Sequence, residues 1–301
     1  MTIYTNKSSN IRKTWLLFSL FLIIVIGIGW AFSRIYGNPS ILYFAVIFSV
    51  LMNVIAYWYS DKIVLKMAKA IPVEKKDNPE LYNIVENLTI TAGLPMPKIY
   101  LIREAQPNAF ATGRDPKHAV VAITEGLLEK LDRSELEGVL AHELSHIGNR
   151  DMLLSTVIVV LVGFISILSD MFLRSTMFGG FRSRDNREGG GQAQMILMLI
   201  GVVLAILAPI AAMLIQLAIS RKREFLADAS GVLLTRYPEG LVLALEKISK
   251  DPTPMRAANN TTAHLWLDDP FRGKKKTSWL RKLFMTHPPI EERIKALRQT
   301  K

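Results

Sequence analysis

Hydrophobic residues gather in four long stretches of the chain, and none of these stretches contains a charged side chain. They cover residues 14–33, 35–60, 152–169 and 192–220. An α-helix needs about 20 predominantly apolar residues to cross the hydrocarbon core of a bilayer. The pattern therefore predicts four transmembrane helices, arranged as two hairpins.

The segments between these stretches show the shorter periodicities of a folded domain. Apolar residues recur at helical spacing after Asn78. Three strand-like runs, parted by turn residues, follow at 97–102, 108–113 and 118–123. Two more helices are expected next: Thr124 can cap the first, and Ser134 with Glu137 forms a capping box for the second. The predicted fold class is a mainly α-helical membrane protein, with four transmembrane helices and an α+β domain.

This pattern divides the chain into four parts. The expected parts are an N-terminal transmembrane hairpin at 1–60, a first soluble part at 61–151, a second hairpin with a Gly- and Arg-rich loop at 152–220, and a second soluble part at 221–301. Half of all residues are hydrophobic and cysteine is absent, so disordered, collagen-like and disulfide-stapled proteins are excluded.

Positive charge is concentrated beside the first hairpin. Residues 1–14 carry three basic and no acidic side chains, and residues 61–76 carry five lysines. By the positive-inside rule, the soluble domain and both termini are expected on the cytoplasmic side of a bacterial cell membrane. The net charge of +11 is then expected to attract the anionic lipid headgroups. The sequence contains no nucleic-acid-binding motif beside this charge. Four arginines between residues 174 and 187 oppose this rule, so full crossing by the second hairpin stays open.

One predicted helix contains the sequence His142-Glu143-Leu-Ser-His146. Two histidines four residues apart lie on one helical face, where both imidazoles can reach a single Zn²⁺ at about 2.1 Å. Glu143 is then placed beside the zinc, where it can act as a general base. The extended metzincin motif is excluded because Asn149 and Met152 stand where it needs Gly and His.

A third zinc ligand is expected from a later helix. Glu224 and Asp228 lie four residues apart after the last apolar stretch. Glu224 would complete a set of two histidines and one carboxylate, and Asp228 could accept the second ring N–H of a ligand histidine. His146 and Glu224 each lie a few residues from an apolar stretch, and a shared ion places both on one side of the membrane. We therefore predict one Zn²⁺ per chain, close to the membrane surface.

Together with the apolar stretches and with Thr286-His287-Pro-Pro-Ile-Glu-Glu-Arg293-Ile, these motifs resemble the HtpX family of bacterial membrane zinc metalloproteases. They are similar more distantly to the Ste24 CAAX proteases and the mitochondrial Oma proteases. The resemblance implies a gluzincin-type protease domain in which the two histidines and Glu224 bind zinc and Glu143 is catalytic.

Four further roles follow from the resemblance alone. It implies that His287 is catalytic and approaches the substrate carbonyl oxygen, where an imidazolium would stabilise the developing oxyanion. It implies that Arg293 is held against Asp228. Asn108 and Ala109 resemble the edge strand that binds substrate backbone in thermolysin-like enzymes, a mode that suits broad specificity. The alternative to these roles is a structural one: Asn108 would be a turn residue after Pro107, and His287 would be a turn residue before two prolines.

The function that these patterns favour is zinc-dependent endopeptidase activity. The resemblance implies quality control of misfolded or damaged membrane proteins and a role in the stress response, with such proteins and the lipid bilayer as partners. A membrane scaffold or transporter with a non-catalytic zinc site is the alternative, although the four apolar stretches lack the ionisable residues that would favour transport. A CAAX-type prenyl-protein protease is a second alternative, for which four spans leave little room to enclose a lipid.

Overall fold

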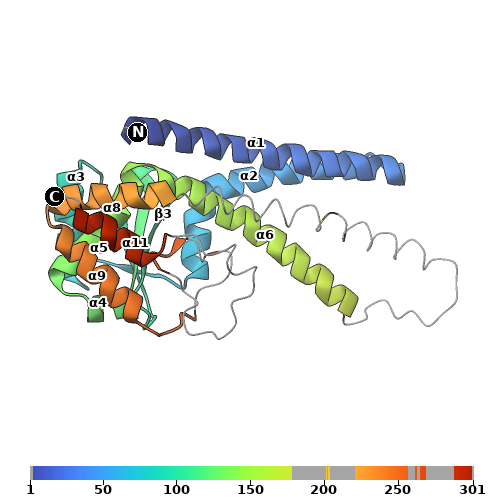
Figure 1. Cartoon of the computed structure of the whole chain (residues 1–301). Helices are drawn as coiled ribbons and strands as arrows, with labels where there is room; N and C mark the ends of the chain where they lie inside the picture. Colours follow the sequence, from blue (N-terminus) through green and yellow to red (C-terminus); the bar gives the residue numbers. More distant parts are fainter. Residues whose placement is uncertain are drawn as a thin grey trace.

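A rod of long helices extends from a compact domain in the computed structural model (Figure 1). The structure describes residues 3–177, 201, 203, 221–256, 262, 265–268 and 288–299. The rod contains α1 (Ile3–Tyr36), α2 (Ser40–Met67) and α6 (Asp151–Met177). The domain contains one sheet and the shorter helices, and it is assembled from two segments that lie on either side of α6 in the sequence.

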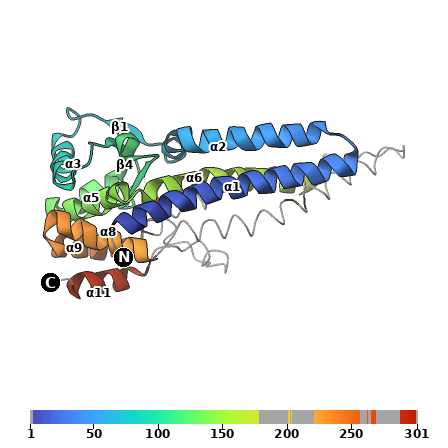
Figure 2. The same cartoon turned by 90° about the horizontal axis from the view of Figure 1, so that it is seen from above.

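Helices α1 and α2 form an antiparallel hairpin with its turn at the end far from the domain (Figure 2). Gly37 adopts a φ of 62° in this turn, a conformation that glycine reaches without steric cost. Ser8–Arg34 and Ser40–Met67 are both long and apolar enough to cross a membrane. The first two predicted spans are therefore confirmed by length and composition.

Of the second predicted hairpin, the structure describes the first helix, α6. Helix α6 packs against α1 and α2 through buried residues such as Leu154 and Leu161. It follows α5 after a bend of 83°, and it counts as a third candidate span only if this bent pair is one crossing. The fourth predicted span, 192–220, lies outside the described residues except for positions 201 and 203. In the described part of the chain the structure thus contains two candidate spans rather than four.

The hairpin surface is suited to a lipid environment. Trp15, Trp30, Tyr43 and Trp58 are all exposed. Within each helix the two aromatic residues are fifteen positions apart, which is about 22 Å at about 1.5 Å per residue. Aromatic side chains at two levels, with exposed aliphatic residues between them, are typical of the two interfaces of a bilayer.

The domain is built on a mixed four-stranded sheet with the order β1-β2-β4-β3. β1 pairs antiparallel with β2, β2 pairs parallel with β4, and β3 pairs antiparallel with β4. The strands are β1 (Ile71–Val73), β2 (Lys98–Ile102), β3 (Ala109–Gly113) and β4 (Ala119–Thr124). The three predicted strands are confirmed. β1 was not predicted, since three residues are too few to show a period.

Both faces of the sheet are covered. Val121 and Ile123 of β4 pack into the main core of the domain, whereas Val120 and Ala122 pack against the end of α2 and Trp266. This explains why β4 reads as a continuous apolar run instead of an alternating one. The sheet is therefore fixed between the domain helices and the base of the rod.

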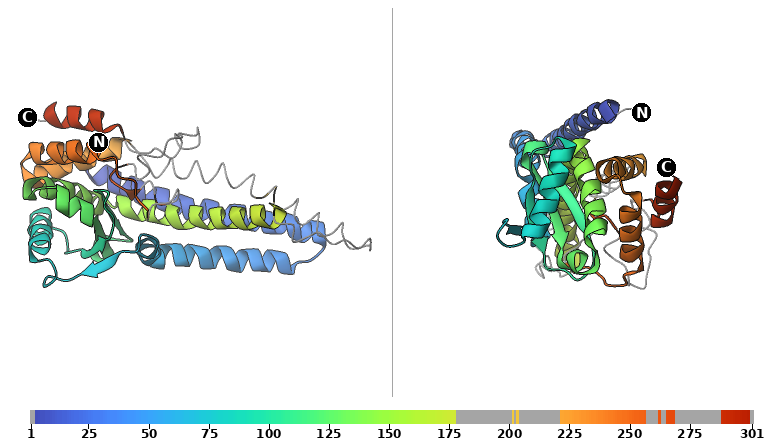
Figure 3. Two further views of the ribbon diagram at one scale, coloured as in Figure 1. Left: turned by 90° about the horizontal axis from the view of Figure 1, so that it is seen from below. Right: turned by 90° about the vertical axis from the view of Figure 1, so that its left-hand side faces the viewer.

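Helix α5 lies at the centre of the domain, between the sheet and the helices α8 and α9 (Figure 3). The domain helices are α3 (Pro79–Ala92), α4 (Glu125–Lys130), α5 (Arg133–Gly148), α8 (Arg221–Thr235), α9 (Pro238–Lys250) and α11 (Ile290–Gln299), with a short 3₁₀ helix at Pro116–His118. Thr124 caps α4 as predicted. The predicted capping box of α5 is wrong: α5 begins two residues earlier than expected, and Asp132 and Glu135 form the box.

Candidate active site

Helix α5 presents His142 and His146 toward α8 from a rigid, buried base. Leu140, Leu144 and Ile147 are fully buried behind them. Burial of three large aliphatic side chains contributes several kcal/mol (about 1.5–3 kcal/mol each) and leaves the helix no freedom to rotate. The two imidazoles are therefore held on one face, with their Nε2 atoms 3.2 Å apart.

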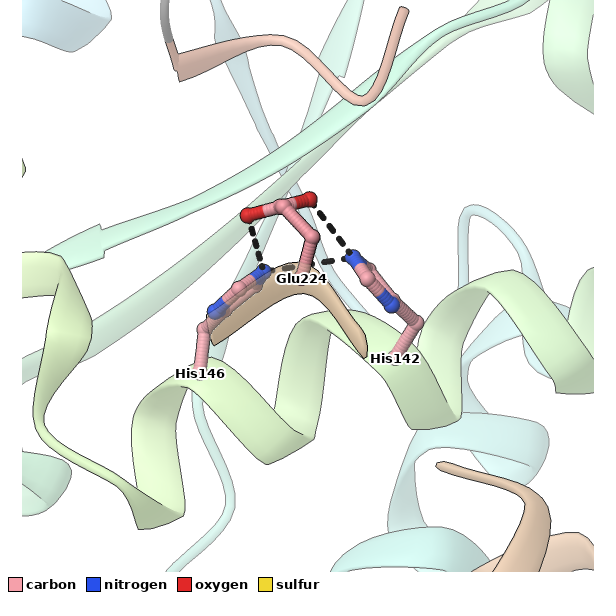
Figure 4. A group of neighbouring side chains, drawn as sticks. All are labelled: His142, His146 and Glu224. Carbon is pink, nitrogen blue, oxygen red and sulfur yellow. Dashed lines mark hydrogen bonds and ion pairs between the residues drawn. The ribbon is translucent and has the colours of Figure 1, made fainter. Parts of the chain in front are cut away.

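Helix α8 brings Glu224 opposite these histidines because its backbone approaches α5 closely. A Cβ atom on Gly231 would lie 3.0 Å from the backbone nitrogen of His142, so the two helices meet at a position that only glycine fits without displacement. Two turns earlier on α8, the Glu224 carboxylate lies 3.7 Å from Nε2 of each histidine. Figure 4 shows the three side chains pointing toward one another.

The three side chains fit a zinc ion. One ligand atom from each, two imidazole nitrogens and a carboxylate oxygen, lies within 4.8 Å of the others. Zinc–ligand bonds of about 2.1 Å at tetrahedral angles separate neighbouring ligand atoms by about 3.4 Å. The separations of 3.2 and 3.7 Å bracket that value. The donor set is thus suited to zinc and leaves a fourth coordination position for water.

His142 is oriented by Asp228, and Asp228 is paired with Arg293. The Nδ1 atom of His142 lies 2.9 Å from Oδ1 of Asp228. Arg293, which is fully buried, donates to both oxygens of Asp228 from Nε at 2.9 Å and from Nη2 at 2.6 Å. Burial raises the pKa of Asp228, but the charge of Arg293 and the hydrogen bond from His142 together lower it to about 2. Asp228 is therefore an anion that fixes the Nδ1–H tautomer of His142.

His146 has a second carboxylate partner that the sequence analysis missed. Its Nδ1 atom lies 3.1 Å from Oδ2 of Asp151, the first residue of α6. Burial lowers the pKa of His146, but the hydrogen bond to Asp151 and the nearby carboxylates of Glu224 and Glu143 raise it to about 9. The site thus attracts positive charge, and a metal cation competes with a proton for His146. The spacing His146 to Asp151 crosses a helix break, so helical periodicity could not reveal it.

Glu143 is buried on α5 beside the ligand histidines. Its carboxylate is close enough to His146 and Arg293 to raise the pKa of both groups. It does not belong to the group of three possible ligands. This placement leaves its carboxylate available for proton transfer.

Asn108 and Ala109 lie at the outer edge of the sheet, and another part of the chain pairs with them. The Ala109 carbonyl accepts a hydrogen bond of 3.1 Å from the Leu267 amide. The Asn108 side chain donates to the Asp268 carbonyl at 3.1 Å and accepts from the Asp268 amide at 3.2 Å. Trp266 is buried against Phe110, with ring centroids 4.8 Å apart. Both residues predicted to bind substrate backbone therefore already bind backbone from residues 267–268.

Three histidines remain to be placed. His287 lies outside the described residues, whereas Arg293, six residues later, reaches the site. His118 is exposed and contacts Asp115. His264 also lies outside the described residues.

The chain is similar to known proteases over nearly its full length. Residues 75–301 match the model of the family described as "Peptidase family M48". The chain is 48% identical to a protease HtpX homolog of Caldanaerobacter subterraneus over 99% of this chain and 97% of that protein. It is 47% identical to a protease HtpX homolog of Thermococcus kodakarensis over 95% of both chains. The crystal structure of S. mikatae Ste24p aligns with a TM-score of 0.49 at 21% identity, over 95% of this chain and 66% of that one.

Two long apolar helices and an HExxH centre joined to a glutamate define the class of membrane-associated metallopeptidases. The chain belongs to peptidase family M48, and its close full-length relatives are the protease HtpX homologs. It is a metalloprotease, so the scaffold or transporter alternative is not favoured.

Proposed function

We propose that this protein is a zinc-dependent endopeptidase that cleaves misfolded or damaged membrane proteins at the cytoplasmic face of the bacterial cell membrane. The observation that carries the proposal is the convergence of His142, His146 and Glu224 at zinc-ligand distances, with buried Glu143 beside them. The position of this site at the base of two membrane-suited helices supports membrane-protein substrates (Figure 2).

In this proposal each side chain has one task. His142, His146 and Glu224 would hold one zinc ion per chain, which when bound supplies a Lewis acid and lowers the pKa of water. Glu143 takes a proton from the attacking water and delivers it to the leaving amine. Asp228 and Asp151 keep Nδ1 of the two histidines protonated, so that each Nε2 lone pair faces the metal. His287 retains its proposed role as a donor to the substrate oxyanion.

Substrate backbone would bind at Asn108 and Ala109 by strand addition. The present pairing of these residues with Leu267 and Asp268 supports this, because it shows that their polar groups can bind a passing main chain. The Ala109 carbonyl and the Asn108 side chain now bind the backbone of residues 267–268. A substrate strand would therefore compete with residues 267–268 for these hydrogen-bonding groups. Recognition of main chain rather than side chains would allow many unrelated damaged proteins to be cut.

The first test of this function is metal removal. We expect that purified protein in detergent cleaves unfolded casein and a denatured membrane protein, and that a strong chelator abolishes both activities. Stoichiometric Zn²⁺ should restore cleavage and Mg²⁺ should not, because two imidazole ligands favour zinc over a hard cation. Elemental analysis should find one zinc per active chain. Cleavage that persists after all metal has been removed would overturn the proposal.

The second test concerns the orientation of the domain. The native chain has no cysteine, so a single cysteine reports on one position. We expect Lys75→Cys and Lys295→Cys, both exposed on the domain, to be protected from a membrane-impermeant thiol reagent in intact cells. Asn38→Cys, in the far turn of the hairpin, should react and serves as the matched control.

After permeabilisation all three variants should react equally. Labelling of Lys75→Cys or Lys295→Cys in intact cells would contradict the cytoplasmic placement. Opposite results at these two positions would contradict a shared zinc site, because the two segments of the domain would then lie on different sides of the membrane.

A further inference from the structure

Asn10, in the first turns of the first membrane helix, is buried although its side chain is polar. It lies five residues before the exposed Trp15, which is about 7–8 Å beyond that aromatic level at about 1.5 Å per residue. This places Asn10 at the membrane surface on the side of the domain. A buried polar side chain at such a position needs partners, and its partners belong to the metal site.

The two amide hydrogens of Asn10 are directed at the bend between α5 and α6. Its Nδ2 atom donates to Oδ1 of Asp151 and, at 3.3 Å, to the Asn149 carbonyl. Asp151 uses its other oxygen to accept from Nδ1 of His146 at 3.1 Å. A continuous chain of hydrogen bonds therefore runs from α1 through Asp151 to a predicted zinc ligand.

The amide oxygen of Asn10 is directed at the other half of the site. It accepts a hydrogen bond of 3.3 Å from Nη1 of Arg223, which is also buried. Arg223 directly precedes Glu224, the predicted third ligand on α8. One side chain of α1 thus connects the helix bend after His146 with the helix that carries Glu224.

These contacts use both donors and the acceptor oxygen of Asn10. An amide side chain has two N–H donors and one carbonyl oxygen, and each of these three groups has a partner here. The side chain therefore has a single orientation that satisfies it, and that orientation fixes the carboxylate of Asp151. Residues that hold a ligand histidine through a carboxylate affect metal affinity without touching the metal.

We propose that Asn10 is a positioning residue of the zinc site, so that α1 is part of the catalytic machinery and not only a membrane anchor. The inference rests on the proposed zinc peptidase function and deepens it. Without Asn10, the carboxylate of Asp151 can rotate away from His146, and the bend can shift relative to α8. The ligand set then loses its fixed geometry although every ligand is still present.

The test measures zinc affinity by chelator competition in Asn10→Leu, which keeps a similar size but has no polar group. We expect affinity to fall about tenfold, at the lower end of the range for outer hydrogen-bond partners of metal ligands. The kcat should fall as well, with KM unchanged because no substrate contact is removed. The visible spectrum of the Co²⁺-substituted protein should also change, since it reports ligand geometry.

Asn53→Leu is the matched control. Asn53 is an asparagine of α2 that donates to the Phe18 carbonyl at 3.1 Å, so this variant also breaks an interhelical hydrogen bond within the rod. It does not reach the metal site, and its zinc affinity and Co²⁺ spectrum should equal those of the wild type. An equal loss in Asn53→Leu would overturn the inference, because the effect would then come from the hairpin as a whole.

A double-variant cycle tests the route through Asp151. If Asn10 acts by holding Asp151, then Asn10→Leu should weaken zinc binding much less in an Asp151→Ala background than in the wild type. If the losses of zinc affinity in Asn10→Leu and Asp151→Ala are additive in the double variant, Asn10 does not act through Asp151. If Asn10→Leu keeps the zinc affinity and the Co²⁺ spectrum of the wild type, the inference itself is overturned. If Asn10→Leu does not fold, Asn10→Asp is used instead. This variant removes the donors but keeps the shape and the oxygen that accepts the hydrogen bond from Arg223, and the same losses are expected. Absence of zinc binding in the wild type would instead reject the proposed function itself.

Discussion

Glu143→Gln is expected to abolish peptide cleavage while the protein keeps its metal. Glutamine has the shape of glutamate but cannot take a proton from water, so general base catalysis is lost. The expected decrease in kcat is about 10²–10⁴-fold. Zinc content should stay at one per chain, because Glu143 is not among the three grouped ligands. Cleavage of unfolded casein and elemental analysis of the same preparation measure both quantities.

The matched control for this prediction is Glu137→Gln on the same helix. The Glu137 carboxylate contacts Arg133 on the outer side of α5, and its loss makes an equal change of charge away from the metal site. Wild-type activity is expected for this variant. If Glu143→Gln cleaves as fast as the wild type, Glu143 is not the base; if it loses zinc, Glu143 has a structural part in holding the metal.

Glu224→Ala should lose zinc outright on dialysis, which removes cleavage as well. Two imidazoles remain, and they cannot replace the one anionic ligand in a site where a proton competes for His146. Asp228→Asn, in contrast, should bind zinc about 10–100-fold more weakly than the wild type, since it changes only the partner of His142. Chelator competition distinguishes these two degrees of loss.

Both variants are compared with Glu239→Ala, which removes a half-exposed carboxylate from α9 and should leave zinc affinity unchanged. Full zinc occupancy in Glu224→Ala would mean that a different residue completes the site. Asp228→Asn is chosen over alanine because Arg293 is fully buried and would otherwise lose its partner, at a cost of about 3–5 kcal/mol in stability.

The sequence alone determined the features that depend on local spacing. Two histidines four residues apart on a helix share a face in any fold, so the pairing of His142 with His146 was visible in the chain. The same holds for Glu224 with Asp228 on α8, and for the first two apolar stretches, whose length alone suits a membrane. The resemblance to the HtpX family implied that these local patterns form one site, and the structure brings His142, His146 and Glu224 together.

Tertiary structure decided the features that depend on contacts between distant residues. Asn10 and Asp151 are 141 positions apart, and their hydrogen bond exists only because the N-terminal end of α1 packs against the bend between α5 and α6. The pairing of Asn108 with Asp268 spans 160 positions. Neither contact can be recognised from a periodic pattern in the sequence. A hydrogen bond between two distant elements depends on how the elements pack, and not on the spacing of residues along the chain. The start of α5 was also decided by tertiary structure. Both Asp132 and Ser134 can cap a helix, and packing of the domain selects Asp132 as the N-cap.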